Sequence, residues 1–86
     1  MNTFLLNITS PEGKIFSEEI QMVTARGVEG DLAILAGHVP FVTTLKPCDC
    51  KVVMPDGSEK IGTADGGILT VSAEQATLLS GSFQWK

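Results

Sequence analysis

The sequence predicts an all-β domain in which short strands close into a sandwich or flattened barrel. Three observations lead to this fold class. Nine glycines and four prolines are spread along the 86 residues, which excludes long helices. Between these breaks the apolar residues mostly alternate, which is the period of a half-buried strand. Turn motifs separate the runs, so about eight to ten strands are expected, and a sandwich buries one face of each.

The first strands are placed by alternation and by one turn. Phe4, Leu6 and Ile8 recur with a period of two. The four residues from Ser10 to Gly13 then put Pro at the second and Gly at the fourth position of a type I turn. We therefore expect a hairpin or corner at this point.

The segment from Phe16 to Thr24 is compatible with two secondary structures. Phe16, Ile20 and Val23 have the i, i+4, i+7 spacing of one helix face. Ile20, Val23 and Thr24 are β-branched, however, and such residues suit a pleated sheet. We favour a strand.

Two glycine-bearing loops flank a short strand from Leu32 to Leu35. The loops run from Gly27 to Asp31 and from Ala36 to Phe41. We expect them to emerge at the same end of the sandwich, because four extended residues span only about 13 Å, provided the intervening chain also turns. They are either plain connectors or, since an acidic loop would adjoin an apolar one, a protein-docking surface.

Alternation and turns continue through the C-terminal half. Strand periods are expected over 41–45, 48–54, 69–71 and 76–78. The residues from Met54 to Gly57 repeat the Pro and Gly turn pattern. The residues from Asp65 to Gly67 predict a tight turn or bulge with positive φ, and those from Ser72 to Gln75 predict a further turn.

Composition limits the classes of partner. Six Lys and Arg against ten Asp and Glu give a formal net charge of −4, which excludes a nucleic-acid surface. No run of 18 apolar residues and no signal-peptide pattern occurs, so we expect a cytoplasmic chain without direct bilayer insertion. A mean hydropathy of +0.22 with 19% charged residues indicates apolar surface covered by another protein.

Cys48 and Cys50 form a C-x-C pair that we interpret as reduced, part-buried thiols. On a strand they share a face, but a disulfide across so short a loop is strained. Together with His38 they fall short of a tetrahedral zinc set unless a carboxylate or another chain adds the fourth ligand. Metal or redox chemistry remains an alternative, and we expect no metal and no cofactor.

No catalytic constellation stands out. His38 is the single histidine, and no nucleophile elbow accompanies it. The residues from Gly27 to Gly30 lack the Gly-Lys-Ser/Thr ending of a phosphate-binding loop. Two acidic pairs are expected to be solvated rather than catalytic, namely Glu18 with Glu19 and Glu29 with Asp31.

Four segments of the chain resemble one known family. They run from Thr9 to Phe16, from Gly27 to Pro40, from Thr43 to Pro47 and from Gly66 to Val71. Their most specific part is the E-G-[ED]-L-x-I-L-x-G-H-x-P core. The sequence resembles the epsilon subunit of the F-type ATP synthase along nearly its entire length. This resemblance implies a ten-stranded β-sandwich as a single domain over residues 1–86, without the family's C-terminal helical hairpin.

The resemblance also implies a function. Epsilon subunits are noncatalytic parts of the central stalk, or rotor, and they link the gamma subunit to the c-ring so that ion translocation drives ATP synthesis. The implied partners are therefore gamma and the c-ring in a hetero-oligomeric complex. The implied location is the cytoplasmic side of the energy-transducing inner membrane, as a peripheral subunit of a bacterial-type enzyme.

Some residues acquire roles through the resemblance. Asp31 falls where the family usually has a Glu that contacts the c-ring, and Asp is one methylene shorter. Ala36 replaces a common Pro, Cys48 a common Gly, and Asp65 a common Ser. The resemblance assigns no gamma-facing residue. The implied c-ring interface comprises Glu29, Asp31, Gly37, His38, Val39 and Pro40.

Two other readings of the chain belong to different classes. One is a stand-alone β-sandwich module that binds another protein or a small ligand. The other is a small thiol enzyme built on Cys48, Cys50 and His38.

Overall fold

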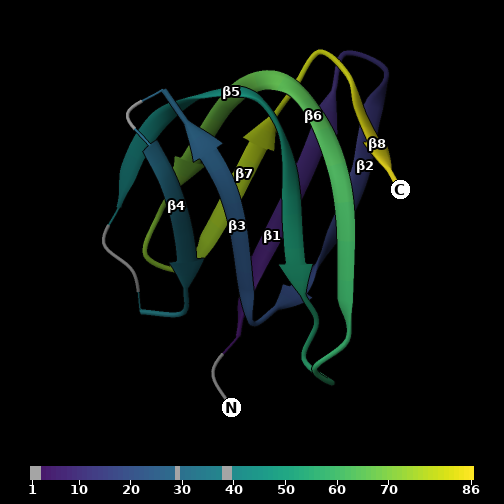
Figure 1. Cartoon of the computed structure of the whole chain (residues 1–86). Coiled ribbons are helices and arrows are strands. Elements are labelled where there is room, and N and C mark those ends of the chain that lie inside the picture. Colours follow the sequence, from purple (N-terminus) through teal and green to yellow (C-terminus); the bar gives the residue numbers. More distant parts are fainter. Residues whose placement is uncertain (1–2, 29, 38–39) are drawn as a thin grey trace.

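The computed structural model describes residues 3–28, 30–37 and 40–86, which form eight β-strands (Figure 1). No helix occurs in these residues, and so none that could cross a membrane. The all-β prediction is confirmed, including strand rather than helix for segment 16–24. The strands are β1 (Phe4–Ser10), β2 (Gly13–Ile20), β3 (Met22–Gly27), β4 (Gly30–Leu35), β5 (Phe41–Val53), β6 (Glu59–Val71), β7 (Gln75–Leu79) and β8 (Phe83–Trp85).

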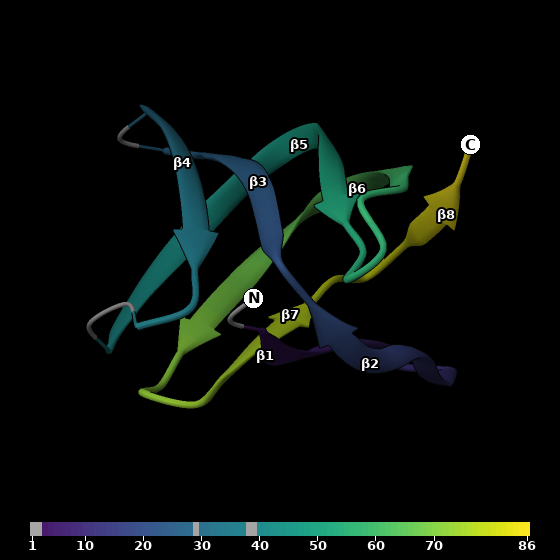
Figure 2. The ribbon, with the colours of Figure 1, turned by 90° about the horizontal axis from the view of Figure 1, so that it is seen from below.

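The strands form one folded-over sheet with the order β2-β1-β7-β6-β5-β3-β4, and β8 pairs with β6. β1 and β7 are parallel, whereas the other pairs are antiparallel. The view from below shows the two layers (Figure 2). The first layer contains β2, β1 and β7, and the second contains β4, β3 and β8. β5 and β6 pass through both.

The passage from one layer to the other occurs at a bend in β6. Residues 68–71 pair with β7, while residues 62–64 pair with β8. Between them Gly66 and Gly67 have φ angles of 80° and 136°, as predicted for glycines with positive φ. The prediction for this segment was a tight turn or a bulge. The strand continues through the bend instead of turning back, so the glycines mark a change of layer and not a tight turn.

The bend also explains why the structure has eight strands rather than ten. β5 and β6 each span 13 residues, and each contributes one half to each layer. For β5 the sequence pattern predicted two shorter strands, because the buried positions change phase near the bend, and for β6 it predicted only the part at 69–71. In β5 the inward positions shift from 41, 43 and 45 to 48, 50 and 52. The β-sandwich architecture itself is confirmed.

The other predicted turns are found where expected. Ser10 pairs with Gly13 where the hairpin between β1 and β2 closes. Between β5 and β6 the Gly57 N–H donates to the Met54 carbonyl at 2.9 Å. Residues 72–75 turn the chain from β6 into β7. Pro and Gly were sufficient to position the first two connections, whereas the turn at 72–75 contains neither residue.

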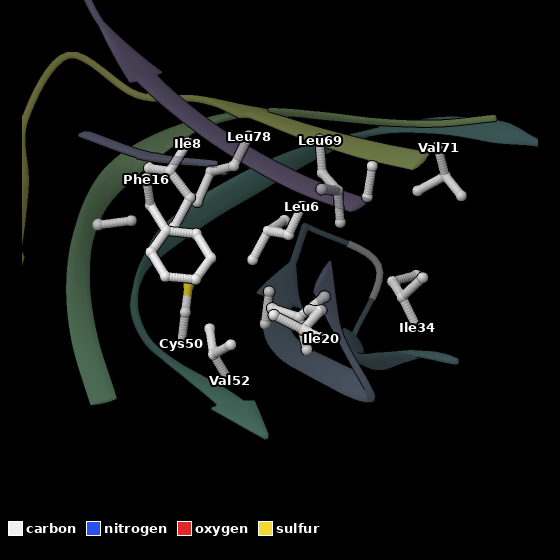
Figure 3. Close-up of a cluster of buried hydrophobic side chains, with 14 of the residues drawn as sticks. Leu6, Ile8, Phe16, Ile20, Ile34, Cys50, Val52, Leu69, Val71 and Leu78 are labelled. Atoms are coloured by element: carbon white, nitrogen blue, oxygen red, sulfur yellow. The ribbon is translucent and has the colours of Figure 1, made fainter. Parts of the chain in front are cut away.

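One apolar core fills the space between the layers (Figure 3). Its side chains come from both layers, so the sandwich closes by burying the inner face of each. Full burial of a large aliphatic side chain contributes about 1.5 to 3 kcal/mol. The largest fully buried side chains are Leu6, Ile8, Ile20, Ile34, Leu69, Val52 and Cys50.

Aromatic side chains hold β8 against β2 at the open side of the sandwich. The Trp85 ring packs edge-on against Phe16, with centroids 5.3 Å apart, and against Phe83 at 5.0 Å. The Lys60 ammonium lies 5.2 Å from the centroid of the Trp85 ring. Because β8 pairs with β6, these rings rather than backbone hydrogen bonds connect β8 to β2.

Candidate docking surfaces

The acidic surface predicted from the sequence lies at the hairpin between β3 and β4. Gly27 pairs with Gly30 where this hairpin closes, and Arg26 lies opposite Asp31. The Arg26 Nε donates to the Asp31 Oδ1 at 2.8 Å. Their side chains are 62% and 75% exposed. Glu29 lies outside the described residues. Asp31 thus already has a basic partner within the chain.

A cleft of about 430 Å³ adjoins this ion pair. The ladder between β3 and β5 is interrupted between Thr24 and Gly27, where β5 bends toward the other layer. Asp49 of β5 faces the cleft together with Arg26 and Asp31. A hydrogen bond from Lys86, and next one from Thr63, lowers the pKa of the Asp49 carboxyl. This end of the molecule is therefore rich in charge of both signs.

The second predicted loop lies at the opposite end of β4. Gly37 and Pro40 are exposed there, and Gly37 has a φ of 83°. Gly37 also borders an open depression of about 800 Å³, together with the N-terminal segment and the turn at residues 72–75. His38 and Val39 lie outside the described residues.

The structure does not bring the two predicted loops together. β4 is one unbroken strand of six residues, which corresponds to a length of about 20 Å. The hairpin with Asp31 precedes it, and the loop with Gly37 and Pro40 follows it. The expectation that both loops emerge at one end is wrong, because it required the intervening chain to turn.

An exposed apolar surface covers the outside of the first layer. Val42, Ile68 and Leu79 are 67%, 45% and 49% exposed. Ile68 pairs with Leu79 on one side and with Thr44 on the other. In the next row Thr70 pairs with Val42. We call these five residues the outer strip. None of them carries a charge.

A groove of about 380 Å³ borders the outer strip. Ile68 and Leu79 form part of its wall, and Thr9, Ser10 and Pro11 form another part. The Thr9 Oγ1 is buried without a hydrogen-bond partner. The strip is therefore continuous with a recess in the surface.

The composition of the chain indicated an exposed apolar surface but not its location. The usable signal was a pair of consecutive apolar residues within a strand, because one member of such a pair must face outward. Phe41 with Val42 and Ile68 with Leu69 are such pairs, and in each the outward member belongs to the outer strip. The sequence alone did not show which member of each pair faces outward, because that depends on which of the two alternating sets of residues faces the core.

The cysteines occupy the inner face of β5. Their Sγ atoms lie 4.0 Å apart, and both thiols are free. Burial raises the pKa of the Cys50 thiol to about 12. Among the described residues no group of three or more His, Cys, Asp or Glu side chains is arranged to hold a metal ion.

Comparison with curated proteins identifies close relatives of the chain. The "ATP synthase epsilon chain, sodium ion specific" of Acetobacterium woodii is 37% identical over 83 residues, which cover 96% of this chain and 62% of that relative. The "ATP synthase epsilon chain" of a Psychrobacter species is 39% identical over 80 residues, 93% of this chain and 58% of that relative. The chain thus spans about three-fifths of the length of the relatives it matches.

Solved structures share the fold. A chain in the Euglena gracilis mitochondrial ATP synthase superposes with a TM-score of 0.91 at 24% identity, over 96% of this chain and 53% of that chain. One in the central stalk and c-ring of the Tetrahymena thermophila mitochondrial enzyme gives 0.78 at 13% identity, over 95% of this chain and 66% of that chain. The family described as "ATP synthase, Delta/Epsilon chain, beta-sandwich domain" matches residues 3–86. The chain belongs to this family.

Proposed function

We propose that the chain is a noncatalytic rotor subunit of a bacterial-type ATP synthase. In this role it links the gamma subunit to the c-ring and couples ion translocation to ATP synthesis. The observation that carries the proposal is the outer strip, an exposed apolar sheet face in a chain whose curated relatives are named ATP synthase epsilon chains. Contiguous apolar surface of this kind usually marks a site that another protein covers.

The outer strip is the proposed contact with gamma. It lies on paired strands, so its side chains are fixed relative to one another by backbone hydrogen bonds. Torque has to pass through an interface that does not slip, and a rigid apolar surface suits that task better than mobile ion pairs do. The groove beside the strip offers a recess for a side chain of gamma.

The proposed contact with the c-ring is the hairpin that carries Glu29 and Asp31. Asp31 lies on β4 in the second layer, whereas the outer strip covers the first layer. The two partners would thus meet different faces of the sandwich. Gly37 lies beyond the other end of β4, about 20 Å from the hairpin, so the two ends would meet the ring at separate points. The Gly37 loop is the alternative ring contact.

The remaining features of the proposal follow from this assembly. Residues 1–86 act as one sandwich domain, held peripherally on the cytoplasmic side of the energy-transducing membrane by gamma and the ring. The nucleotide chemistry takes place on other subunits.

Co-purification with gamma tests the proposal. The tagged chain is expressed with the gamma subunit of the same organism, and gel filtration is used to look for a one-to-one complex. We expect the complex to survive washing at high salt, since the outer strip has no charge to screen. A folded monomer that does not bind gamma would refute the rotor assignment and favour a stand-alone binding module.

A second experiment separates the two candidate ring contacts. Asp31→Arg and Pro40→Arg are compared in inverted membranes by ATP-driven ion pumping. We expect Asp31→Arg to lower pumping relative to ATP hydrolysis and Pro40→Arg to leave that ratio unchanged. The reverse pattern would move the ring contact to the Gly37 loop.

A further inference from the structure

Cys48 and Cys50 bring two thiols together on the inner face of β5. Cys50 is 1% exposed, and Cys48 is half-buried. Across the ladder Cys48 lies opposite Ala64, and Cys50 lies opposite Gly62. Neither neighbour has a side chain larger than a methyl group. The proposed rotor function makes no use of this pair.

The backbone disfavours a disulfide between them. Residues two apart on a strand have Cα atoms about 6.6 Å apart, near the upper end of the range for disulfides. The Sγ atoms are 4.0 Å apart and would have to approach by about 2 Å to form a bond. Extended strand geometry therefore keeps two adjacent thiols from joining directly.

The same separation suits a soft metal ion. Two metal–sulfur bonds of about 2.3 Å span this gap when the S–metal–S angle is about 120°. Zn²⁺ prefers four protein ligands, which this pair does not supply, whereas thiolates select Cu(I), an ion that accepts two or three sulfur ligands. We propose that Cys48 and Cys50 form a two-thiolate site for a thiophilic monovalent metal ion, with Cu(I) as its representative.

The surroundings give the site one open side. The Cys50 sulfur is directed toward the Phe16 ring (Figure 3). The Phe83 ring occupies the space that a side chain at Gly62 would need. An ion therefore approaches by way of Cys48, the more exposed thiol, and binds Cys50 second. Water or a small solute completes the coordination on that side.

Binding is a proton exchange without redox change. Cu(I) forms one bond to each sulfur, and each thiol releases its proton to solvent. Protons therefore compete with the metal for both sulfurs at neutral pH. Apparent affinity should consequently rise at least tenfold per pH unit between pH 6 and 8.

Titration with Cu(I) alone under anaerobic conditions tests the site. Trp85 is the single tryptophan of the chain and an internal reporter, because Gly62 pairs both with it and with Cys50. Two interstrand steps amount to about 9.6 Å. We expect one ion per chain by native mass spectrometry and quenching of the tryptophan fluorescence with the same stoichiometry.

Variants decide whether both thiols bind. Cys48→Ser and Cys50→Ala should each lower the affinity at least 100-fold, with circular dichroism confirming the fold. Asp49→Asn, between them on the opposite face, is the matched control and should bind as the wild type does. Position 48 is partly exposed, so Cys48→Ser should fold. If Cys50→Ala does not fold, the affinity of Cys48→Ser alone decides whether the thiols bind the ion. Failure of the wild type to retain an ion, or equal affinity in Cys48→Ser, would overturn the site. Neither result bears on binding to gamma.

Discussion

The outer strip and the hairpin end with Arg26 and Asp31 are both exposed, yet they offer different kinds of contact. Val42, Ile68 and Leu79 each retain about half of their surface for a partner to cover, which corresponds to about 1 kcal/mol per side chain. The exposed ion pair between Arg26 and Asp31 contributes about 0 to 1 kcal/mol in total. The outer strip can therefore supply most of the binding free energy for a partner, whereas the charged hairpin end is better suited to orienting a partner.

The largest expected effect comes from the bend beneath the strip. A Cβ at Gly67 would overlap the Leu79 carbonyl oxygen, and its φ of 136° is strained for any other residue. We expect Gly67→Ala to lower the free energy of unfolding by about 3 kcal/mol or more, measured by urea denaturation. Gly81→Ala is the control, since its Cβ meets open space. Equal stability of the two variants would show that the bend is not rigid.

The next largest effect concerns affinity for gamma. Ile68→Asp places a charge in the middle of the outer strip, and we expect the gamma complex to weaken about 100-fold. Ile61→Asp is a matched control on the same strand, because Ile61 is 43% exposed but lies in the half of β6 that belongs to the second layer. Surface plasmon resonance on immobilised gamma measures the dissociation constants of both variants. Equal losses would remove the strip from the interface.

Alkaline pH tests the contribution of the buried Cys50 thiol to the stability of the fold. Burial raises the pKa of the Cys50 thiol in the folded chain from its ordinary value of 9.0 to about 12. Stability from this group is thus complete below pH 9 and is lost as pH rises toward 12, by up to about 1.4 kcal/mol per unit. Thermal unfolding from pH 8 to 11 should show a shallower decline for Cys50→Ala. If stability fell equally with pH in the wild type and in Cys50→Ala, the raised pKa of Cys50 would be contradicted.

The smallest effect is expected for the fold at the hairpin end. Asp31→Arg removes an exposed ion pair, so unfolding free energy should change by less than about 0.5 to 1 kcal/mol. Urea denaturation in low and high salt measures this, with the difference shrinking at high salt. A loss of several kcal/mol would mean that the pair is structural, and coupling defects in this variant could then not be assigned to the ring.

Local sequence information was sufficient for strands and turns but not for long-range placement. Alternation identified Phe4, Leu6 and Ile8 as inward residues, because burial in a strand has a period of two. It could not reveal that β5 and β6 continue through a bend, since a phase change looks the same as a chain break. The pairing of Arg26 with Asp31 depends on hairpin register, and the separation of the two loops depends on β4 staying straight.

The parallel pairing of β1 with β7 has a consequence for biosynthesis. Leu5 aligns with Gln75, so the N-terminal strand waits for a partner made about 70 residues later. On the ribosome, the β1–β2 hairpin emerges early with one strand edge open and an apolar face unburied. The sandwich closes only when β7 (Gln75–Leu79) has left the exit tunnel. Nascent chains released before β7 should therefore be the ones that depend on chaperones.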